Sequence, residues 1–204
     1  ASGGVLTFAS APDYETKSTY TATVTASDGT NSITQDITVN VTNLNDNNPI
    51  VSSNPVFTVE EGVKDVGTII ATDADGDELS YAIYKPNGSG FQNCDIAIEE
   101  ETGVMAFYEA PDYETKNLYT CRVGVTDGTN TTTQDITVNV TDVNDDAPVF
   151  TSSATFSVPE NQLVIGQVTA TDADGDDITY SISGSEININ SSTCLLYTSD
   201  AADE

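Results

Sequence analysis

The chain has 204 residues, of which 33 are Asp or Glu and 5 are Lys or Arg, so its formal net charge is −28 at pH 7. It contains no His and no Trp. A surface this negative repels nucleic acids and anionic membranes, and we expect neither as a partner. The chain contains no run of about 18 apolar residues, so no membrane-spanning helix is predicted. No charged-then-apolar leader begins the chain either, but both ends look truncated, so we draw no conclusion about secretion from it.

Short β-strands are predicted along most of the chain. Thr, Val, Ile and Tyr alternate with polar residues in runs bounded by Gly, Pro, Asn and Asp, which is the pattern of half-buried strands and their turns. High acidity with few aromatic residues is also typical of disorder. The regular alternation argues against disorder here, and we expect an all-β fold.

An internal repeat organises the chain. Ala-Pro-Asp-Tyr-Glu-Thr-Lys begins at residue 11 and again at 110, and Thr-Gln-Asp-Ile-Thr-Val-Asn-Val-Thr begins at 34 and again at 133, a spacing of 99 residues in both cases. This is the usual size of a small sandwich domain. The spacing predicts the C-terminal part of one repeat (1–46), one complete repeat (47–146) and the N-terminal part of a third (147–193).

Within the complete repeat we predict seven strands, at about 55–60, 66–72, 79–83, 94–98, 104–108, 118–126 and 131–140. Seven short strands separated by turns are typical of a Greek-key β-sandwich. The period of two predicts which side chains of the last two strands point into the core. They are Tyr119, Cys121, Val123, Val125, Ile136, Val138 and Val140. Thr102-Gly103 predicts a tight turn, because Gly adopts a positive φ at little steric cost.

The last residues depart from the repeat. Residues 189–193 correspond to 98–102, but Cys194 stands where the complete repeat has Gly103. From there to Glu204 the repeat is lost, and the segment resembles the in-frame translation of a sequencing adapter. We predict that 194–204 is an artefact tail, and a short divergent tail is the alternative. Sequencing the locus would distinguish the two.

Acidic residues return in one order along the repeats. They include Glu61, Asp112 with Glu114, the run 142–146, and Asp-Ala-Asp-Gly-Asp at 73–77 and 172–176. In a sandwich of seven strands, alternate strand ends and the exit segment meet at one pole, where they face the loops of the next repeat. Two carboxylates about 4 Å apart repel by roughly 4 kcal/mol at an effective dielectric near 20. A cluster at such a joint therefore requires a cation.

Ca²⁺ suits such a joint best, because it takes about 6–8 oxygen ligands from carboxylates, amides and backbone carbonyls. Mg²⁺ loses its water reluctantly and suits a large carboxylate cage less well. Without His, and without Cys beside the acids, no soft-metal site is expected. The segments 73–77 and 172–176 resemble a Ca²⁺ loop by themselves, but they lack its distal Glu, and we assign them to the joints.

The succession of these motifs resembles the cadherin repeat. It comprises Pro159-Glu160-Asn161 (Glu61 in the earlier copy), Asp-Ala-Asp, Asp-Tyr-Glu, Thr-Asp-Gly and the linker Asp-Val-Asn-Asp-Asp-Ala-Pro, in the family's order over residues 1–193. The resemblance implies tandem cadherin-like, immunoglobulin-like β-sandwich repeats that bind Ca²⁺ where two repeats meet.

The resemblance also implies which residues are ligands. At the second joint, which follows the complete repeat, they are the side chains of Glu61, Asp112, Glu114, Asn144, Asp145, Asp172 and Asp174 and the backbone oxygens of Val143 and Asp146. At the first joint, they are the side chains of Asp13, Glu15, Asn45, Asp46, Asp73, Asp75 and Asp127 and the backbone oxygens of Leu44 and Asn47.

Both ligand sets are incomplete against the family pattern. The first joint lacks the Pro-Glu-Asn glutamate, and the second lacks the Thr-Asp-Gly aspartate of the third repeat. Asp28 is expected to serve a joint that precedes the first partial repeat. Asn43 stands where the second linker has Asp142, so we expect weaker Ca²⁺ binding at the first joint.

Simpler interpretations of single residues stay open. Any one Asp in a loop can serve only as a turn residue. Asp112 and Glu114 could form a general acid–base pair, but no nucleophile or oxyanion donor accompanies them, and we predict no catalytic residue and no enzyme. Cys121 aligns with Ala22 and could be a buried apolar filler. A disulfide with Cys94 is the alternative, which a Cα separation above about 7 Å would exclude.

These features predict a calcium-binding segment of a large extracellular adhesion protein, in which Ca²⁺ at each joint makes the array rigid. Millimolar extracellular Ca²⁺ suits weak sites of this kind. The near-identical copies resemble the arrays of bacterial surface or secreted adhesins. The expected partners are neighbouring repeats of the same chain, and the parent protein could be anchored to a membrane or cell surface. The alternatives are a direct homophilic or glycan-binding adhesion module and a non-catalytic module of a secreted enzyme.

Overall fold

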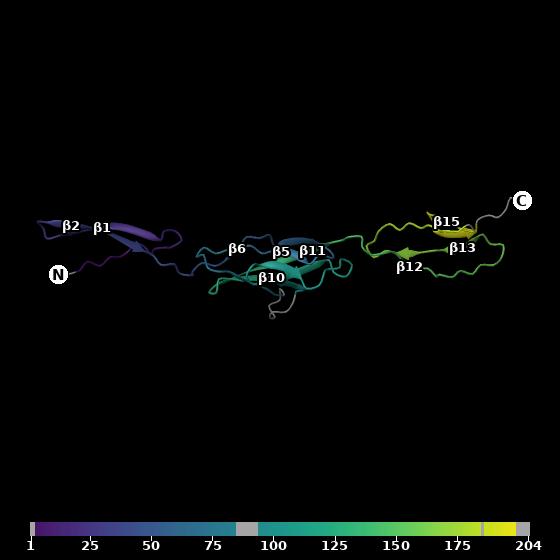
Figure 1. Cartoon of the computed structure of the whole chain (residues 1–204), viewed down its shortest axis with the longest axis horizontal. Helices are drawn as coiled ribbons and strands as arrows, with labels where there is room; N and C mark the ends of the chain where they lie inside the picture. The colour runs from purple at the N-terminus through teal and green to yellow at the C-terminus, as the bar shows by residue number, and fades with distance from the viewer. Residues whose placement is uncertain (1–2, 85–93, 185, 199–204) are drawn as a thin grey trace. The chain divides into compact units, whose positions relative to one another are not determined.

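A computed structural model describes residues 3–84, 94–184 and 186–198, and these residues form strands and turns (Figure 1). The prediction of an all-β fold is confirmed. In the described ranges, no helix is long and apolar enough to cross a membrane. The chain divides into two compact units. One comprises Ala1–Val59, Val63–Ala110 and Leu118–Asn139, and the other comprises Glu60–Gly62, Pro111–Asn117 and Val140–Glu204.

The range predicted as the first partial repeat contains a two-stranded hairpin; the bounds of the repeats stay a prediction, and their names serve below as labels for these ranges. β1 (Thr19–Ser27) pairs antiparallel with β2 (Ser32–Asn40), and Tyr20 lies opposite Val39. The connecting turn is closed by Asp28, whose Oδ1 accepts hydrogen bonds from the N–H groups of Thr30 at 2.8 Å and Asn31 at 2.7 Å. Side chains of Asp and Asn stabilise turns in this way. The Asp-Gly-Thr-Asn sequence therefore determines the end of the hairpin.

The complete repeat contains two main sheets and one short ladder. Their strand orders are β4-β11-β10-β7, β5-β9-β8 and β3-β6. The strands are β3 (Ile50–Val51), β4 (Val56–Glu60), β5 (Asp65–Thr68), β6 (Ala71–Thr72), β7 (Ser80–Tyr84), β8 (Ile96–Ile98), β9 (Val104–Phe107), β10 (Leu118–Thr126) and β11 (Thr131–Thr141).

The core of the complete repeat consists of alternate residues of these strands. All seven residues predicted to point inward from β10 and β11 are buried, so the predicted faces are correct. Ile96, Met105 and Phe107 of the other sheet are buried as well. The rings of Phe107 and Tyr119 meet edge to face with their centroids 4.8 Å apart, a favourable geometry for aromatic pairs. The two main sheets therefore pack as a sandwich.

A disulfide between Cys94 and Cys121 joins the two sheets. The Cα atoms are 5.7 Å apart, within the range that a disulfide spans. Cys121 lies in β10 and Cys94 just before β8. Of the two alternatives that the sequence left open, the structure therefore shows the bridge.

The prediction of one strand over 66–72 is wrong. The chain forms β5 and then β6, which pair with β9 and β3 respectively. Between them, the N–H of the buried Ile69 bonds to the carbonyl of Gly103 at 2.9 Å, and the carbonyl of Ile70 accepts the N–H of Ser52 at 2.8 Å. The apolar residues continue through this crossing while the pairing partner changes, so alternation alone does not show the break. Strand β3 was not predicted.

The third partial repeat repeats the order of the β5-β9-β8 sheet. Its strands are β12 (Val149–Phe150), β13 (Val164–Gln167), β14 (Ala170–Thr171), β15 (Ile187–Ile189) and β16 (Leu195–Thr198), with the orders β12-β14 and β13-β16-β15. Cys194 has φ +57°, close to the +71° of Gly103 in the equivalent turn. Strand β16 therefore takes the position of β9. The artefact origin of 194–204 stays a prediction, and residues 199–204 lie outside the described residues.

Candidate metal centres

Glu61 holds together three segments of the second joint. It follows β4 and is only 7% exposed, and both its carboxylate oxygens accept backbone hydrogen bonds. The N–H of Tyr113 donates to Oε2 at 2.8 Å, and the N–H of Val143 donates to Oε1 at 2.7 Å. Gly62, at φ +73°, turns the chain so that its own N–H reaches the carbonyl of Pro111 at 2.9 Å. The carboxylate is therefore fixed at the joint by the backbone.

Acidic side chains from those three segments and the next loop converge on Asp174. Within each of three groups, the carboxylate oxygens lie within 4.8 Å of one another. The groups are Glu61, Glu114, Asp142 and Asp174; Glu114, Asp145, Asp146 and Asp174; and Asp172, Asp174 and Asp176. The N–H of Asp146 donates to Oδ2 of Asp174 at 2.9 Å and orients that carboxylate.

The second oxygen of Asp174 provides a test of whether these residues fit a cation. Its Oδ1 is buried and has no hydrogen-bond donor among the described residues, and Oδ2 of Asp73 at the first joint is in the same condition. A buried oxygen without a donor is costly unless another ligand satisfies it. The surrounding donors are hard carboxylate oxygens, which Ca²⁺ prefers. The residues present therefore fit Ca²⁺.

Mutual repulsion perturbs the ionisation of the second joint. The pKa of Asp142 is raised by partial burial and by the charges of Asp174 and Glu61. The pKa of Asp145 is raised by burial and by the same two charges. A hydrogen bond from its own backbone lowers the pKa of Glu114, but burial and the neighbouring carboxylates outweigh it, so the net shift is upward. All three carboxylates are therefore repelled by the charges of Glu61 and Asp174 when they ionise.

Two predicted ligands of the second joint lie outside the three groups. The carboxylate of Asp112 closes its own turn by accepting hydrogen bonds from the N–H of Thr115 at 3.1 Å and its hydroxyl at 2.8 Å. Both bonds lower the pKa of Asp112, and the bond from the Thr115 hydroxyl has the larger effect. Asn144 donates from its side-chain amide to Oδ2 of Asp176. Val143 and Asp146 lie in the linker, where their N–H groups are the atoms that bond to carboxylates.

The first joint repeats part of this geometry. Carboxylate oxygens lie within 4.8 Å of one another in two groups, Glu15, Asp46 and Asp75, and Asp73, Asp75 and Asp77. The N–H of Asn47 donates to Oδ2 of Asp75 at 2.8 Å, which is the counterpart of the bond between Asp146 and Asp174. Asn43 donates from its side-chain amide to the carbonyl of Asp75 at 2.7 Å, whereas its counterpart Asp142 adds a negative charge. The first joint therefore contains fewer converging carboxylates.

The pKa values of the carboxylates at the first joint are shifted by the same kinds of cause. Hydrogen bonds from the side chain and backbone of Asn47 lower the pKa of Asp75. The pKa of Asp77 is raised by burial and by the charges of Asp73 and Asp75. A hydrogen bond from its own backbone lowers the pKa of Glu15, but burial and the proximity of Asp75 give a net upward shift. Of these three carboxylates, only Asp75 has a lowered pKa, which favours its charged form.

Three more predicted ligands of the first joint serve in turns or bridges. Oδ1 of Asp127 accepts the N–H groups of Thr129 at 2.7 Å and Asn130 at 2.6 Å. Asn130 then donates to Oδ1 of Asn45 at 2.9 Å, which joins this turn to the linker. Asp13 accepts the N–H of Thr16 at 3.1 Å. Asp13 and Asp127 therefore lie outside the carboxylate groups, as Asp112 does.

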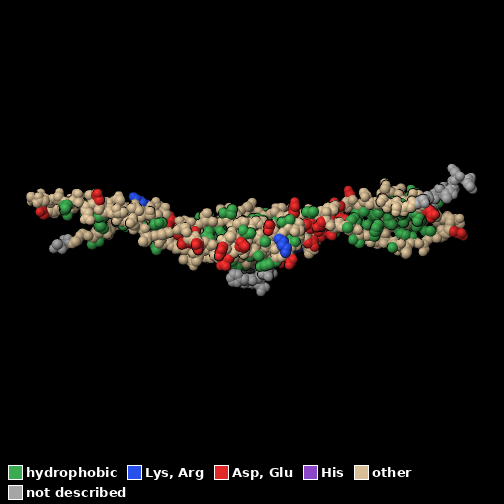
Figure 2. Space-filling view, viewed as in Figure 1, with side chains coloured by type: hydrophobic (Ala, Val, Ile, Leu, Met, Phe, Trp, Pro, Cys, Tyr) green, Lys and Arg blue, Asp and Glu red, His purple; other side chains and the backbone are tan. Residues whose placement is uncertain are grey.

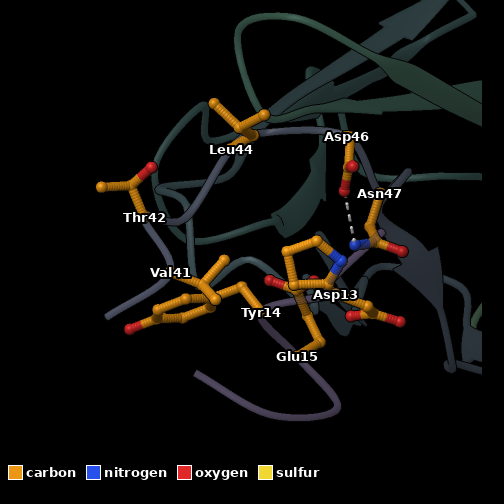
Figure 3. A pocket seen from close by; sticks show the side chains of 9 residues that line it. Asp13, Tyr14, Glu15, Val41, Thr42, Leu44, Asp46 and Asn47 are labelled. Carbon is orange, nitrogen blue, oxygen red and sulfur yellow. Dashed lines mark hydrogen bonds between the residues drawn. The ribbon is translucent and has the colours of Figure 1, made fainter. Parts of the chain in front are cut away.

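A cavity of about 550 Å³ lies beside the first linker (Figure 3). It is lined by Pro12, Asp13, Tyr14, Glu15, Val41, Thr42, Leu44, Asp46 and Asn47. The side-chain amide of Asn47 donates to Oδ1 of Asp46 at 3.1 Å at its edge. Leu44, predicted to provide a backbone oxygen, lines this cavity.

Three carboxylates in these groups were not predicted as ligands, namely Asp77, Asp142 and Asp176. Each stands next to predicted ligands in an acidic run, and this proximity was the available signal. The family pattern assigns neither the last aspartate of the loop nor the first residue of the linker. The face drawn in Figure 2 shows many more Asp and Glu than Lys and Arg side chains, in line with the 33 acidic and 5 basic residues of the chain.

Known proteins have sequences similar to that of this chain. Human Protocadherin Fat 1 is 37% identical over 179 residues, which are 79% of this chain and 4% of that protein. Cadherin-3 of Caenorhabditis elegans is 34% identical over 192 residues, which are 90% of this chain and 6% of that protein. The chain consists of cadherin-like repeats. It spans only these small fractions of its curated relatives, and no family model matches it.

Solved structures of cadherin repeats have the same fold. Repeats EC22-24 of mouse cadherin-23 are 27% identical with a TM-score of 0.63, covering 92% of this chain and 66% of that one. Repeats EC21-23 of human CDH23 have a TM-score of 0.72 at 21% identity, covering 94% and 67%. The predicted cadherin-like sandwich is confirmed. The repeats of this chain are extracellular, adhesion-type cadherin domains. The bacterial type of array stays a prediction.

Proposed function

We propose that this cadherin-like segment binds Ca²⁺ at its two joints and is a stiffening part of a large extracellular adhesion protein. The buried Oδ1 of Asp174, which has no donor among the described residues and belongs to a residue shared by three carboxylate groups, carries this proposal. The carboxylates that would hold the ion at the second joint are Glu61, Glu114, Asp142, Asp145, Asp146, Asp172, Asp174 and Asp176. At the first joint they are Glu15, Asp46, Asp73, Asp75 and Asp77.

The chain's own bonds position these ligands before any cation binds. Backbone N–H groups hold Glu61, and the N–H of Asp146 holds Asp174, so the linker and the following loop are already in register. A bound Ca²⁺ ion supplies the positive charge that offsets carboxylate repulsion. The linker, which otherwise has repelling carboxylates on both sides, then becomes stiff.

The partners in this role are the neighbouring repeats of the same chain. Relatives that consist of cadherin repeats are adhesion proteins, which supports a non-catalytic function in the parent protein. Asp112 also has a lowered pKa and caps its own turn, a state that does not suit a general acid. We therefore infer that Asp112 and Glu114 are not a general acid–base pair, and we assign Glu114 to the cation and Asp112 to its own turn beside it.

Melting of the full chain in calcium and in chelator tests the proposal. We expect Ca²⁺ to raise the melting temperature and Mg²⁺ to do so much less, because Mg²⁺ dehydrates reluctantly. Asp174→Asn should remove most of the increase. Asp177→Asn changes the charge equally, but Asp177 is an exposed residue outside the carboxylate groups, and it should keep the increase. Equal melting in calcium and chelator would refute the proposal, and so would equal effects of the two variants.

A further inference from the structure

Asn-x-Ser/Thr triplets are a sequence motif that the two joints do not use. In an extracellular protein such a triplet is the acceptor for N-linked glycosylation, and the repeats of this chain are extracellular domains. The triplets begin at Asn40, Asn87, Asn130, Asn139 and Asn190. Asn87 lies outside the described residues. In the complete repeat, Asn130 immediately precedes β11 and Asn139 lies within it, so one strand carries two triplets in different surroundings.

The fold accounts for the triplet that begins at Asn130. The side-chain amide of Asn130 donates hydrogen bonds to Oδ1 of Asn45 at 2.9 Å and to the carbonyl of Asn47 at 3.1 Å, both in the first linker. The hydroxyl of Thr132, the third residue of the triplet, donates to the carbonyl of Pro49 at 2.6 Å. Both side chains therefore connect the hairpin to the linker. A sugar on this amide nitrogen would replace one of its hydrogens and collide with the linker.

The fold does not account for the triplet that begins at Asn139. Val138 and Val140, on either side of it, are 0% and 4% exposed, so the side chain of Asn139 points away from the core. It is partly exposed, and among the described residues it has no hydrogen-bond partner. Asn is unfavourable within strands. This position therefore carries a polar amide that contributes nothing to the sheet and points to the surface.

The same arrangement recurs in the first partial repeat. Subtraction of 99 from the residue numbers gives Asn40-Val41-Thr42 in β2, which is also an acceptor triplet. Asn40 is exposed, and its Oδ1 accepts only a long bond of 3.4 Å from the hydroxyl of Thr19. The counterpart of Asn130 is Asn31, which is followed by Ser32-Ile33 and is not an acceptor. The triplet present in both copies is thus the one whose amide points outward.

We propose that Asn139 carries an N-linked oligosaccharide, whereas Asn130 does not. In the transfer, the amide nitrogen of Asn139 attacks the anomeric carbon of an oligosaccharide linked to a lipid diphosphate. A C–N bond forms, the bond between that carbon and the diphosphate oxygen breaks, and the lipid diphosphate leaves with the proton that the amide loses. No group is oxidised or reduced. Eukaryotic secretory pathways supply this donor, and the relatives named above are eukaryotic proteins.

The outer face of the sheet has a place for the glycan. A glycan is bulky and hydrophilic, so it must stay at the surface of the folded chain. Asn139 lies opposite Leu118 of β10, which is 51% exposed. Directly opposite residues of an antiparallel pair have Cβ atoms about 4.5–5.5 Å apart. The first sugar on Asn139 would therefore lie over Leu118 and shield this apolar side chain from water.

Peptide mapping of the full chain, secreted from an animal cell line, tests the proposal. Peptide N-glycosidase acting in heavy-oxygen water converts each modified asparagine to a labelled aspartate, so mass spectrometry reads every triplet separately. We expect the label at Asn139 and none at Asn130. An unmodified Asn139 would overturn the proposal, and so would a glycan at Asn130. The mapping does not depend on calcium, so its outcome is separate from that of the proposed calcium binding.

Substitutions at the third residue of the triplet provide matched controls. Thr141→Ala removes the acceptor motif and should abolish the glycan at Asn139, whereas Thr141→Ser keeps the motif and should keep the glycan. Melting in chelator of chains made in a host without the lipid-linked donor tests the structural contrast. Asn139→Gln should leave the melting temperature unchanged, and Asn130→Gln should lower it, because only Asn130 bonds to the linker. Equal melting of these two variants would overturn the distinction between the triplets.

Discussion

The Oε1 atom of Glu61 accepts a 2.7 Å hydrogen bond from the N–H of Val143, 82 residues later in the chain. The other oxygen of the same carboxylate accepts the N–H of Tyr113 at 2.8 Å. One side chain thus connects the end of β4, the Asp-Tyr-Glu turn and the linker. It has two functions in the proposed site, as the acceptor that closes the joint and as a ligand for the cation.

Glu61→Gln should separate these functions. The Gln side chain keeps one acceptor oxygen, which can still accept one of the two backbone N–H groups. It carries no charge, and its NH₂ group faces the other N–H group, so two donors oppose each other there. We expect calcium affinity to fall by about tenfold or more, because the ligand charge sets the affinity of such sites. Isothermal titration of the full chain measures it. Glu60→Gln changes the exposed neighbouring residue and should have little effect. Equal losses in both variants would show that only net charge matters.

The stability of the second joint should depend on pH in two directions. The pKa values of Glu114, Asp142 and Asp145 are raised, so the folded chain binds these protons more tightly than the unfolded chain does. Without calcium, their ionisation destabilises the fold as pH rises through the raised pKa values, and mild acidification from neutral pH should stabilise it. Asp112 has a lowered pKa, and its contribution is lost as pH falls further through that value.

Melting temperatures measured against pH check this expectation. In chelator, the melting temperature should rise on mild acidification and then fall at lower pH. In calcium the first change should reverse, because protons compete with the cation for the same oxygens. A melting temperature in chelator that only falls on acidification would contradict the assignment of repulsion to these three carboxylates.

Exchanging the residues at one linker position should exchange the strengths of the two joints. Asn43→Asp adds a carboxylate beside Asp75, and Asp142→Asn removes one from the group around Asp174. Each change should shift calcium affinity by roughly tenfold, upward at the first joint and downward at the second, because ligand charge tunes such sites. Titration calorimetry should resolve the two sites. If neither variant changes the calcium affinity, this linker position does not contribute to calcium binding.

Removal of the disulfide should destabilise the complete repeat. Cys94 and Cys121 are 27 residues apart in sequence, and closing a loop of that length contributes about 3 kcal/mol. Cys121→Ala restores the residue that the first repeat has at Ala22 and should lower the free energy of unfolding by about that amount. Cys194→Ala alters the free cysteine and serves as the control. Denaturant unfolding with and without reductant measures both, and reductant should have no effect on Cys121→Ala.

The turn before β9 and its counterpart before β16 should respond oppositely to substitution. Gly103 has φ +71°, and a Cβ there would lie 2.6 Å from the carbonyl oxygen of Ile69. Gly103→Ala should therefore cost about 2–3 kcal/mol. Cys194 has a similar positive φ, so Cys194→Gly should relieve about 1 kcal/mol of strain. Hydrogen exchange of the β16 amides reports the second change, and unchanged protection would show that the turn at 194 is unstrained.

Much of the fold was predictable because it depends on local patterns. The alternation in β10 and β11 was sufficient to predict that Val123 and Val138 point inward, since side chains of a strand alternate between its faces. The spacing of 99 residues was sufficient to match the motifs of the two joints. The break between β5 and β6 was not predictable, because Ile69 and Ile70 stay apolar while their hydrogen bonds pass to different sheets.

The sequence by itself determined the fold class, the repeat and the supply of carboxylates. Only the tertiary structure decided which carboxylates converge, because a carboxylate turns toward the nearest donors. Asp112 and Asp127 find N–H groups in their own turns and face those turns. Asp142, which the sequence did not identify as a ligand, converges with Glu61 and Asp174. The bond between Cys94 and Cys121 was decided in the same way, since only the packing of the two sheets brings these distant positions together.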